Sequence, residues 1–472
     1  MWFFREIVTY LICALQVLGI QLIPVVTPTP LEGRLYAEEA PVAVTPDESS
    51  YLSVRVLDEG CDIYAPDQRD SSGYRYGPSM ILNADGSIDA WFAAPGAFGQ
   101  WDWITYRHSP DGGKSWTDEK VVLQPTPDSP DFYSVCDPGV VYFGGYYYLG
   151  YTSTTNEGGV DNHAFVARSR TPDGPYEKWN GAGWGGKPQP IVAYTGSSER
   201  WGIGEPSFVV KGDTLYIYYT LDSVDESGTA FRRTNVCLAD AADENWPATI
   251  YGHQAAIAYT AGGSDSADVK YIEDYGKFIA VSTAMRMGED SYVAMYESND
   301  GLTFFETERL YTHVSWYCHN SGMLSRPNGH IRIGDKLMIG YAYGRGWGNW
   351  ATRLHEIEIS LSGTNEFSDA GNPNTHREIE KLPNKPYNQY IGISAQPGYH
   401  TLNAGESMQA VVWKIENNLE KHKILWGDIT LSGYDSNIIA VSGKKITARN
   451  PGETFVTAQW GEHKTIFLVK VN

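Results

Sequence analysis

Residues 51–390 consist of short apolar and aromatic runs separated by Gly, Asp, Asn and Pro turns. Almost none of this region has the three- and four-residue apolar spacing of an amphipathic helix. The stretch CDPGVVYFGGYYYLGYT at 136–152 is typical: Gly144-Gly145 separates two β-prone runs, which is the sequence form of a tight hairpin. The pattern therefore predicts an all-β fold.

A turn-forming residue followed by an apolar strand recurs five times. The segments are YGPSMIL, CDPGVVYF, GEPSFVV, ADVKYIE and HNSGMLS, and aligning Gly77, Asp137, Glu205, Asp268 and Asn320 as their heads gives spacings of 60, 68, 63 and 52 residues. About sixty residues per unit suits a four-stranded propeller blade, and five units suit a closed ring. Because the innermost strands of a propeller line its central channel, the five heads are expected to meet at one mouth. We therefore expect a five-bladed β-propeller over 51–390.

The two ends of the chain differ from this repeat. Residues 7–26 carry no charge and follow Arg5, so 1–40 is predicted to be a signal peptide and lead-in. The uncharged run is also long enough to span a bilayer, which leaves an uncleaved N-terminal anchor as the alternative to a secreted protein. Residues 395–472 alternate apolar and polar positions and contain NIIAVSGKKITARNPGET, a pattern that resembles bacterial Ig-like group 2 domains. That resemblance implies a small β-sandwich that acts as a spacer or in cell-wall or surface association.

Charge and cysteine content narrow the function. The formal net charge of −21 argues against nucleic acid and anionic membrane surfaces as partners. The four cysteines outside the leader form no CxxC pair, so no zinc site is predicted. Aromatic residues make up 13% of the chain and suit either packing between sheets or stacking on sugar rings.

HSPDGGKSW at 108–116 is a complete Asp-box, with Ser109, Asp111, Gly113 and Trp116. In this hairpin the Asp side chain is expected to bind turn amides and the Trp to pack between sheets. Asp111 is therefore predicted to be structural, and the box supports a propeller without indicating an activity.

The heads and their strands resemble the furanosidase-type five-bladed propeller enzymes, especially glycoside hydrolase family 43. The resemblance is carried by CDPGVVYFGGYYYLGYT, ARSRTPDGPYEKW, GIGEPSFVVKGDTLYIYYT and CHNSGMLSRPNG. It implies a glycoside hydrolase that needs no cofactor, uses an inverting mechanism and acts on an arabinose- or xylose-type poly- or oligosaccharide. Glu205 matches the general acid of that family, and Asp137 matches one of its two aspartates. His319 matches a fifth-blade histidine that in some members sits beside a central cation or water, which implies a structural calcium ion near it.

The first blade departs from that pattern because Gly77 stands where the family has its first Asp. The base must then come from elsewhere, and Asp62, Asp67 and Asp268 are the candidates. Trp201 and Trp101 are candidate sugar platforms, although packing between blades is the alternative for each.

Two other functions stay open at this stage. YRYGPSMILNADG followed by the Asp-box resembles the first blade of sialidases, in which Arg75 would bind the substrate carboxylate and Asp102 would be the acid/base residue. The missing first-blade Asp also favours a non-catalytic carbohydrate-binding propeller.

Overall fold

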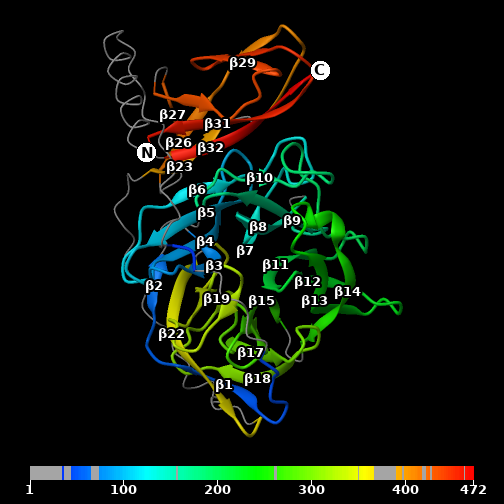
Figure 1. Ribbon diagram of the computed structural model, residues 1–472, viewed down its shortest axis with the longest axis vertical. Coiled ribbons are helices and arrows are strands. Elements are labelled where there is room, and N and C mark those ends of the chain that lie inside the picture. Colours follow the sequence, from blue (N-terminus) through cyan, green and yellow to red (C-terminus); the bar gives the residue numbers. More distant parts are fainter. Residues whose placement is uncertain are drawn as a thin grey trace, which may run out of the picture.

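The computed structural model describes residues 34–36, 44–64, 74–155, 158–259, 263–348, 350–365, 390–395, 398–416, 421–425, 428–461 and 463–472. The described residues form a ring of radial sheets and a smaller β unit beside it (Figure 1). They include one short 3₁₀ segment, η2 (Trp246–Thr249), and no helix long and apolar enough to cross a membrane. The expected leader at 1–40 lies outside these ranges except for residues 34–36.

Five four-stranded groups make up the ring, each running from the centre outward. They are blade 1, β3 (Tyr76–Leu82), β4 (Ile88–Pro95), β5 (Asp102–Ser109) and β6 (Lys120–Leu123); blade 2, β7 (Cys136–Phe143), β8 (Tyr146–Ser153), β9 (His163–Ser169) and β10 (Glu177–Lys178); blade 3, β11 (Gly202–Lys211), β12 (Thr214–Val224), β13 (Ala230–Asp240) and β14 (Tyr251–Ala258); blade 4, β15 (Asp265–Ile272), β16 (Lys277–Ala284), β17 (Tyr292–Ser298) and β18 (Phe305–Leu310); and blade 5, β19 (Cys318–Ser325), β21 (Met338–Tyr343), β22 (Ala351–Ser362) and β1 (Tyr51–Val56). β2 (Cys61–Tyr64) also pairs with β22, and β20 (His330–Ile331) pairs with β15. The five-bladed all-β prediction is confirmed.

The ring closes in two ways. β1, from the N-terminal end, pairs antiparallel with β22 from Tyr51↔Ser362 to Val56↔Ile357, so both ends of the propeller sequence contribute to blade 5. At the centre each inner strand contacts the next, in the order β3, β7, β11, β15, β19 and back to β3. Glycine permits this approach: a Cβ at Gly139 would lie 1.8 Å from the carbonyl oxygen of Pro206, and one at Gly322 would lie 1.9 Å from that of Pro78.

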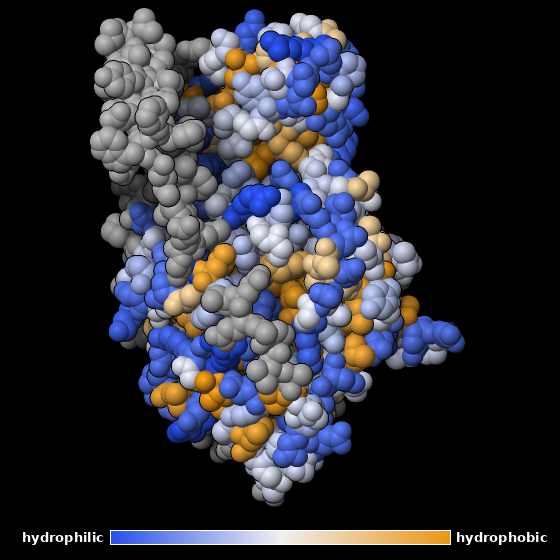
Figure 2. Space-filling model, in the orientation of Figure 1, coloured by the Kyte–Doolittle hydropathy of each residue, from blue (hydrophilic) through white to orange (hydrophobic). Residues whose placement is uncertain are grey.

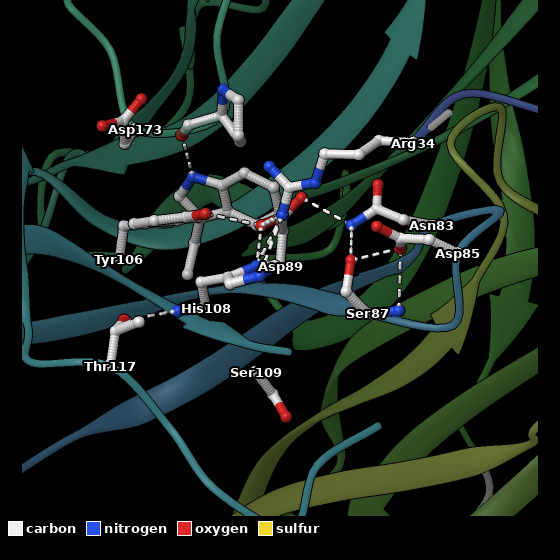
Figure 3. A network of polar contacts seen from close by, with 12 residues as sticks. Arg34, Asn83, Asp85, Ser87, Asp89, Tyr106, His108, Ser109, Thr117 and Asp173 are labelled. Carbon is white, nitrogen blue, oxygen red and sulfur yellow. Dashed lines mark hydrogen bonds and ion pairs between the residues drawn. The ribbon is translucent and has the colours of Figure 1, made fainter. Parts of the chain in front are cut away.

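Residues 34–36 bind to the hairpin end of blade 1, opposite the strand heads. Asp89 is fully buried there and accepts hydrogen bonds from the Tyr106 hydroxyl (2.5 Å) and Asn83 Nδ2 (2.8 Å), while Arg34 Nη2 (3.2 Å) and His108 Nδ1 (2.9 Å) lie beside it (Figure 3). Burial alone would raise the pKa of Asp89, but His108 and Arg34 hold it below its ordinary value. Residues 34–36, which belong to the expected leader and lead-in, thus contact the propeller.

The described residues of the smaller unit form ten strands around their own apolar core. They are β23 (Tyr390–Ala395), β24 (Tyr399–Leu402), β25 (Ser407–Gln409), β26 (Val412–Glu416), β27 (Lys421–Lys423), β28 (Thr430–Ser432), β29 (Ile439–Ser442), β30 (Lys445–Ala448), β31 (Gly452–Trp460) and β32 (His463–Val471). Side chains from several of its sheets, among them Ile393, Ile446 and Phe467, share the core, as in a β-sandwich. We call this unit the C-terminal sandwich.

The C-terminal sandwich packs against the outer edge of blade 1. β23 and β32 contact β6, and the Thr465 hydroxyl donates to Gln124 Oε1 at 2.9 Å. The face drawn in Figure 2 carries hydrophobic residues interspersed with hydrophilic ones on both the propeller and the sandwich.

Candidate active site

The five strand heads share one backbone conformation. Each has a positive φ at a point where the inner strand shifts register against its neighbour, namely Gly77 (+61°), Asp137 (+49°), Glu205 (+53°), Ser266 (+56°) and Asn320 (+43°). This left-handed conformation is uncommon for residues other than glycine. Its recurrence marks the heads as equivalent positions in the five blades.

The fourth head is Ser266, so the sequence alignment on Asp268 is wrong by two residues. Asp268 instead occupies the position of Ser79 and Ser207, two residues beyond a head. The three side chains tie blades together: Ser79 Oγ accepts the amide N–H of Val140 (2.9 Å), Ser207 Oγ that of Val269 (2.9 Å), and Asp268 Oδ2 that of Met323 (2.7 Å).

The other oxygen of Asp268 is also engaged. Its Oδ1 accepts from the Ser207 hydroxyl at 2.7 Å and pairs with Lys270 Nζ at 2.6 Å. Asp268 lines the pocket but is held as an inter-blade contact, so we remove it from the candidate bases.

Residues at and just beyond the strand heads line a small hollow at the centre of the ring. Asp137 and Glu205 both line it, with Gly77 and Ser266 on the remaining sides. The two acidic residues are only 8% and 7% exposed, so each carboxyl group is largely withdrawn from water. The sequence prediction that Asp137 and Glu205 meet across one pocket therefore describes their placement correctly.

Glu205 is held from two sides. Its amide N–H donates to Thr152 Oγ1 of blade 2 at 2.7 Å, and its Oε1 accepts from Asn320 Nδ2 of blade 5 at 3.1 Å. Because Asn320 uses its amide nitrogen for Glu205, its Oδ1 faces His319 Nδ1, 2.7 Å away, and that nitrogen must carry the proton. The fifth head thus orients the carboxyl group of the third.

His319 is fully buried, and burial lowers its pKa to about 3, so the ring stays neutral. With the proton on Nδ1, Nε2 is a buried acceptor that has no hydrogen-bond partner among the described residues. Those residues contain no group of three or more His, Cys, Asp or Glu side chains suited to a metal. The calcium ion that the resemblance implies near His319 therefore stays a prediction.

Asp102 is a further buried acid next to the pocket. The Tyr74 hydroxyl donates to its Oδ1 and the Ser134 hydroxyl to its Oδ2 (3.0 Å). Burial, assisted by the negative charge of Asp137, raises the pKa of Asp102 to about 7. The sequence singled out Asp102 only through the sialidase-like pattern, because nothing in a single sequence shows that its carboxyl group is buried near Asp137.

Arg75 is not available to bind a substrate carboxylate. It is fully buried, and its Nε and Nη2 donate to both oxygens of Glu119 at 2.6 and 2.7 Å. Asp62 is bound in a similar way, by Arg353 Nε at 2.7 Å and the Tyr343 hydroxyl at 2.8 Å. These ion pairs hold together parts of blades 1 and 5. Because their charged groups are already paired, Arg75 and Asp62 are no longer candidates for substrate binding or catalysis. Asp67 lies outside the described residues.

The two predicted sugar platforms occupy different environments. Trp201 packs over Gly204, next to Glu205, where a Cβ added to the glycine would lie 2.8 Å from the Trp ring. Trp101 is 38% exposed at the same end of the propeller as the heads. The Asp-box is structural: Asp111 Oδ1 accepts the amides of Lys114 (3.1 Å) and Ser115 (2.8 Å) at the opposite end.

Comparison with known proteins gives structural relatives only. No family model and no curated protein matches the chain. Solved structures that resemble it include a family 117 glycoside hydrolase from the marine bacterium Zobellia galactanivorans (15% identity, 66% of this chain, 92% of that chain, TM-score 0.46), an endo-arabinase from Bacteroides thetaiotaomicron (16%, 63%, 98%, 0.44) and a thermostable family-43 glycoside hydrolase (14%, 69%, 97%, 0.44).

Proposed function

We propose that this protein is a glycoside hydrolase with Glu205 as the general acid. The observation that carries the proposal is the pairing of Asp137 and Glu205, both buried, at equivalent heads of adjacent blades that line one pocket. Glycosidic cleavage needs an acid at the leaving oxygen and a carboxylate at the opposite face of the sugar. Two buried carboxyl groups that line one hollow supply both groups.

Asn320 assigns roles to the two oxygens of Glu205. Because Oε1 accepts the Asn320 amide proton, the acid proton is carried by Oε2. That proton passes to the leaving oxygen as the glycosidic bond breaks, and the sugar is then attacked by a water whose proton goes to a carboxylate. We assign Asp137 as the carboxylate that accepts this proton, or as the residue that modulates Glu205 by its negative charge.

We propose an inverting mechanism on an arabinose- or xylose-type glycan, as the resemblance to family 43 implies. The chain is also proposed to be exported, with residues 395–472 serving as a surface-associated module. The pocket needs no cofactor for acid–base cleavage, because both proton transfers use carboxyl groups.

The test is sugar release from arabinan, arabinoxylan, xylan, fructan and sialylated glycans by the wild type and Glu205→Gln. Glutamine keeps the shape and the contact with Asn320 but carries no acid proton. The proposal predicts release by the wild type and a loss of about 100-fold or more in the variant, the scale of a missing general acid. Equal rates in the two proteins would overturn the role of Glu205.

A non-catalytic glycan-binding propeller is the second candidate, and Gly77 is the observation that favours it. The first head carries no side chain, so the described heads supply two acids where the family pattern has three. This candidate predicts that neither protein releases sugar from any glycan, while both bind one of them.

A further inference from the structure

Three aromatic side chains form a surface stripe outside the pocket, at the end of the propeller that carries the heads. Trp101 and Phe132 are 38% and 45% exposed, and Tyr133 lies between them with ring centroids 5.6 and 6.2 Å away. We call these three residues the aromatic stripe. Its backbone is fixed, since the amide of Trp101 donates to the carbonyl of Tyr133 at 2.8 Å.

The stripe is connected to the pocket through two short segments. Trp101 precedes Asp102, whose side chain accepts from the Ser134 hydroxyl at 3.0 Å and whose carbonyl accepts from the amide of Val135 at 3.1 Å. Asp137, which lines the pocket, follows two residues after Val135. The stripe and one of the two pocket acids therefore belong to one hydrogen-bonded unit.

The C-terminal sandwich supports the loop that carries Trp101. Phe98, in the turn between β4 and β5, stacks on Trp103 (centroids 6.3 Å apart) and packs against Trp413 of the sandwich (6.0 Å). These rings form one apolar cluster with Ala97 and Val121. Gln100 Oε1 also accepts the Trp103 indole N–H at 2.7 Å. Only Gly99 and Gln100 separate Phe98, which contacts Trp413, from Trp101.

We propose that the aromatic stripe binds a neutral polysaccharide chain as it leaves the pocket, and that the C-terminal sandwich holds the stripe in place through Trp413. The occupant follows from three features. Aromatic rings stack on the C–H faces of sugars. The pocket is small and is lined by residues at and just beyond the strand heads, so a polymer bound there must extend outside it. A chain with net charge −21 repels a polyanion. That one end of the polysaccharide occupies the pocket rests on the proposed function.

The experiment is affinity electrophoresis in native gels that contain linear arabinan or arabinoxylan. Glu205→Gln is the parent protein, so the polysaccharide stays intact during the run. Trp101→Ala and Phe132→Ala are expected to weaken retardation by about 2- to 10-fold in Kd each, the range for one aromatic contact. Tyr251→Ala is the matched control, because Tyr251 is 56% exposed on β14 at the outer edge of blade 3, and it should migrate like the parent.

The support role is tested in the same gels with Trp413→Ala and Trp413→Phe. The alanine variant should lose retardation as Trp101→Ala does, and phenylalanine should restore it. Circular dichroism and the thermal midpoint of each variant verify that the propeller is folded. A folded Trp413→Ala protein that binds like the parent would overturn the support role.

The outcomes separate this inference from the proposed function. If the wild type releases sugar but no stripe variant changes retardation, the stripe is not a binding site and the hydrolase proposal stands. If retardation depends on Trp101 and Phe132 while no glycan is cleaved, the stripe stands and the hydrolase proposal falls. A parent that no polysaccharide retards, or whose Trp101 and Phe132 govern self-association in sedimentation instead, overturns the inference.

Discussion

Asp102→Asn should change how the stability of the protein depends on pH. In the folded protein the pKa of Asp102 is about 7, because the group is buried and faces the charge of Asp137, whereas the ordinary value is 3.8. The folded state therefore binds this proton more tightly than the unfolded state does. The resulting stabilisation is fully present below pH 3.8 and is lost as the pH rises through 7.

The size of the effect follows from the two pKa values. A difference of about three units, at about 1.4 kcal/mol each, gives roughly 4 kcal/mol. Asparagine keeps an acceptor oxygen for one of the two hydroxyls, Tyr74 or Ser134, and presents N–H donors to the other, and it cannot titrate. Relative to the wild type, Asp102→Asn should therefore gain about 4 kcal/mol in the free energy of unfolding between pH 4 and pH 8.

Urea unfolding of the two proteins at half-unit steps from pH 4 to pH 8 measures this difference. Asp111→Asn is the control, because the exposed Asp111 has its pKa lowered to about 2 by the Ser115 hydroxyl and turn amides, and it should show no change across that range. A constant difference between wild type and Asp102→Asn at all pH values would refute the account of Asp102.

Three further variants test separate parts of the structure. Gly139→Ala should cost about 3 kcal/mol of unfolding free energy in urea, because the added Cβ would overlap the Pro206 carbonyl. Gly77→Ala should cost about 1–2 kcal/mol, because its Cβ meets nothing closer than 3.6 Å and only the positive φ is unfavourable. Equal costs for the two variants would contradict the close approach of the inner strands. Asn320→Ala removes the donor that holds Glu205 Oε1, so kcat should fall by about tenfold, the ~1.4 kcal/mol of one hydrogen bond. An unchanged kcat would separate Asn320 from catalysis. Arg34→Ala should lower the free energy of unfolding by about 2 kcal/mol, because buried Asp89 loses a charged donor. An unchanged thermal melting curve would show that residues 34–36 do not stabilise the ring.

The repeat was visible in the sequence because local chemistry sets it. A turn-forming head must precede each inner strand, and Asp137-Pro138 and Glu205-Pro206 show this directly. The sequence alignment took Asp268 as the fourth head because it is the acidic residue in that segment. The feature that the blades share is a small or polar side chain two residues after each head, and Asp268 occupies that position. Aligning Asp268 with Ser79 and Ser207 would have identified Ser266.

The roles of the charged residues outside the heads could not be predicted in this way. Arg75 lies 44 residues from Glu119, and only the folded sheet brings them together. The raised pKa of Asp102 depends on its burial and on the charge of Asp137, and these two acids belong to different blades. The support of Phe98 by Trp413 likewise requires the placement of the C-terminal sandwich, which no local pattern encodes.

The most direct test of the central claim is the leaving-group dependence of Glu205→Gln. A general acid matters when the leaving oxygen needs a proton, and it matters little when the leaving group is already a stable anion. Aryl glycosides of the sugar released by the wild type, with leaving groups of decreasing pKa, are compared with the natural glycan. The account predicts that the variant loses about 100-fold or more on the natural glycan and recovers towards the wild-type rate as the leaving-group pKa falls. An equal loss on every substrate would show that Glu205 is not the acid.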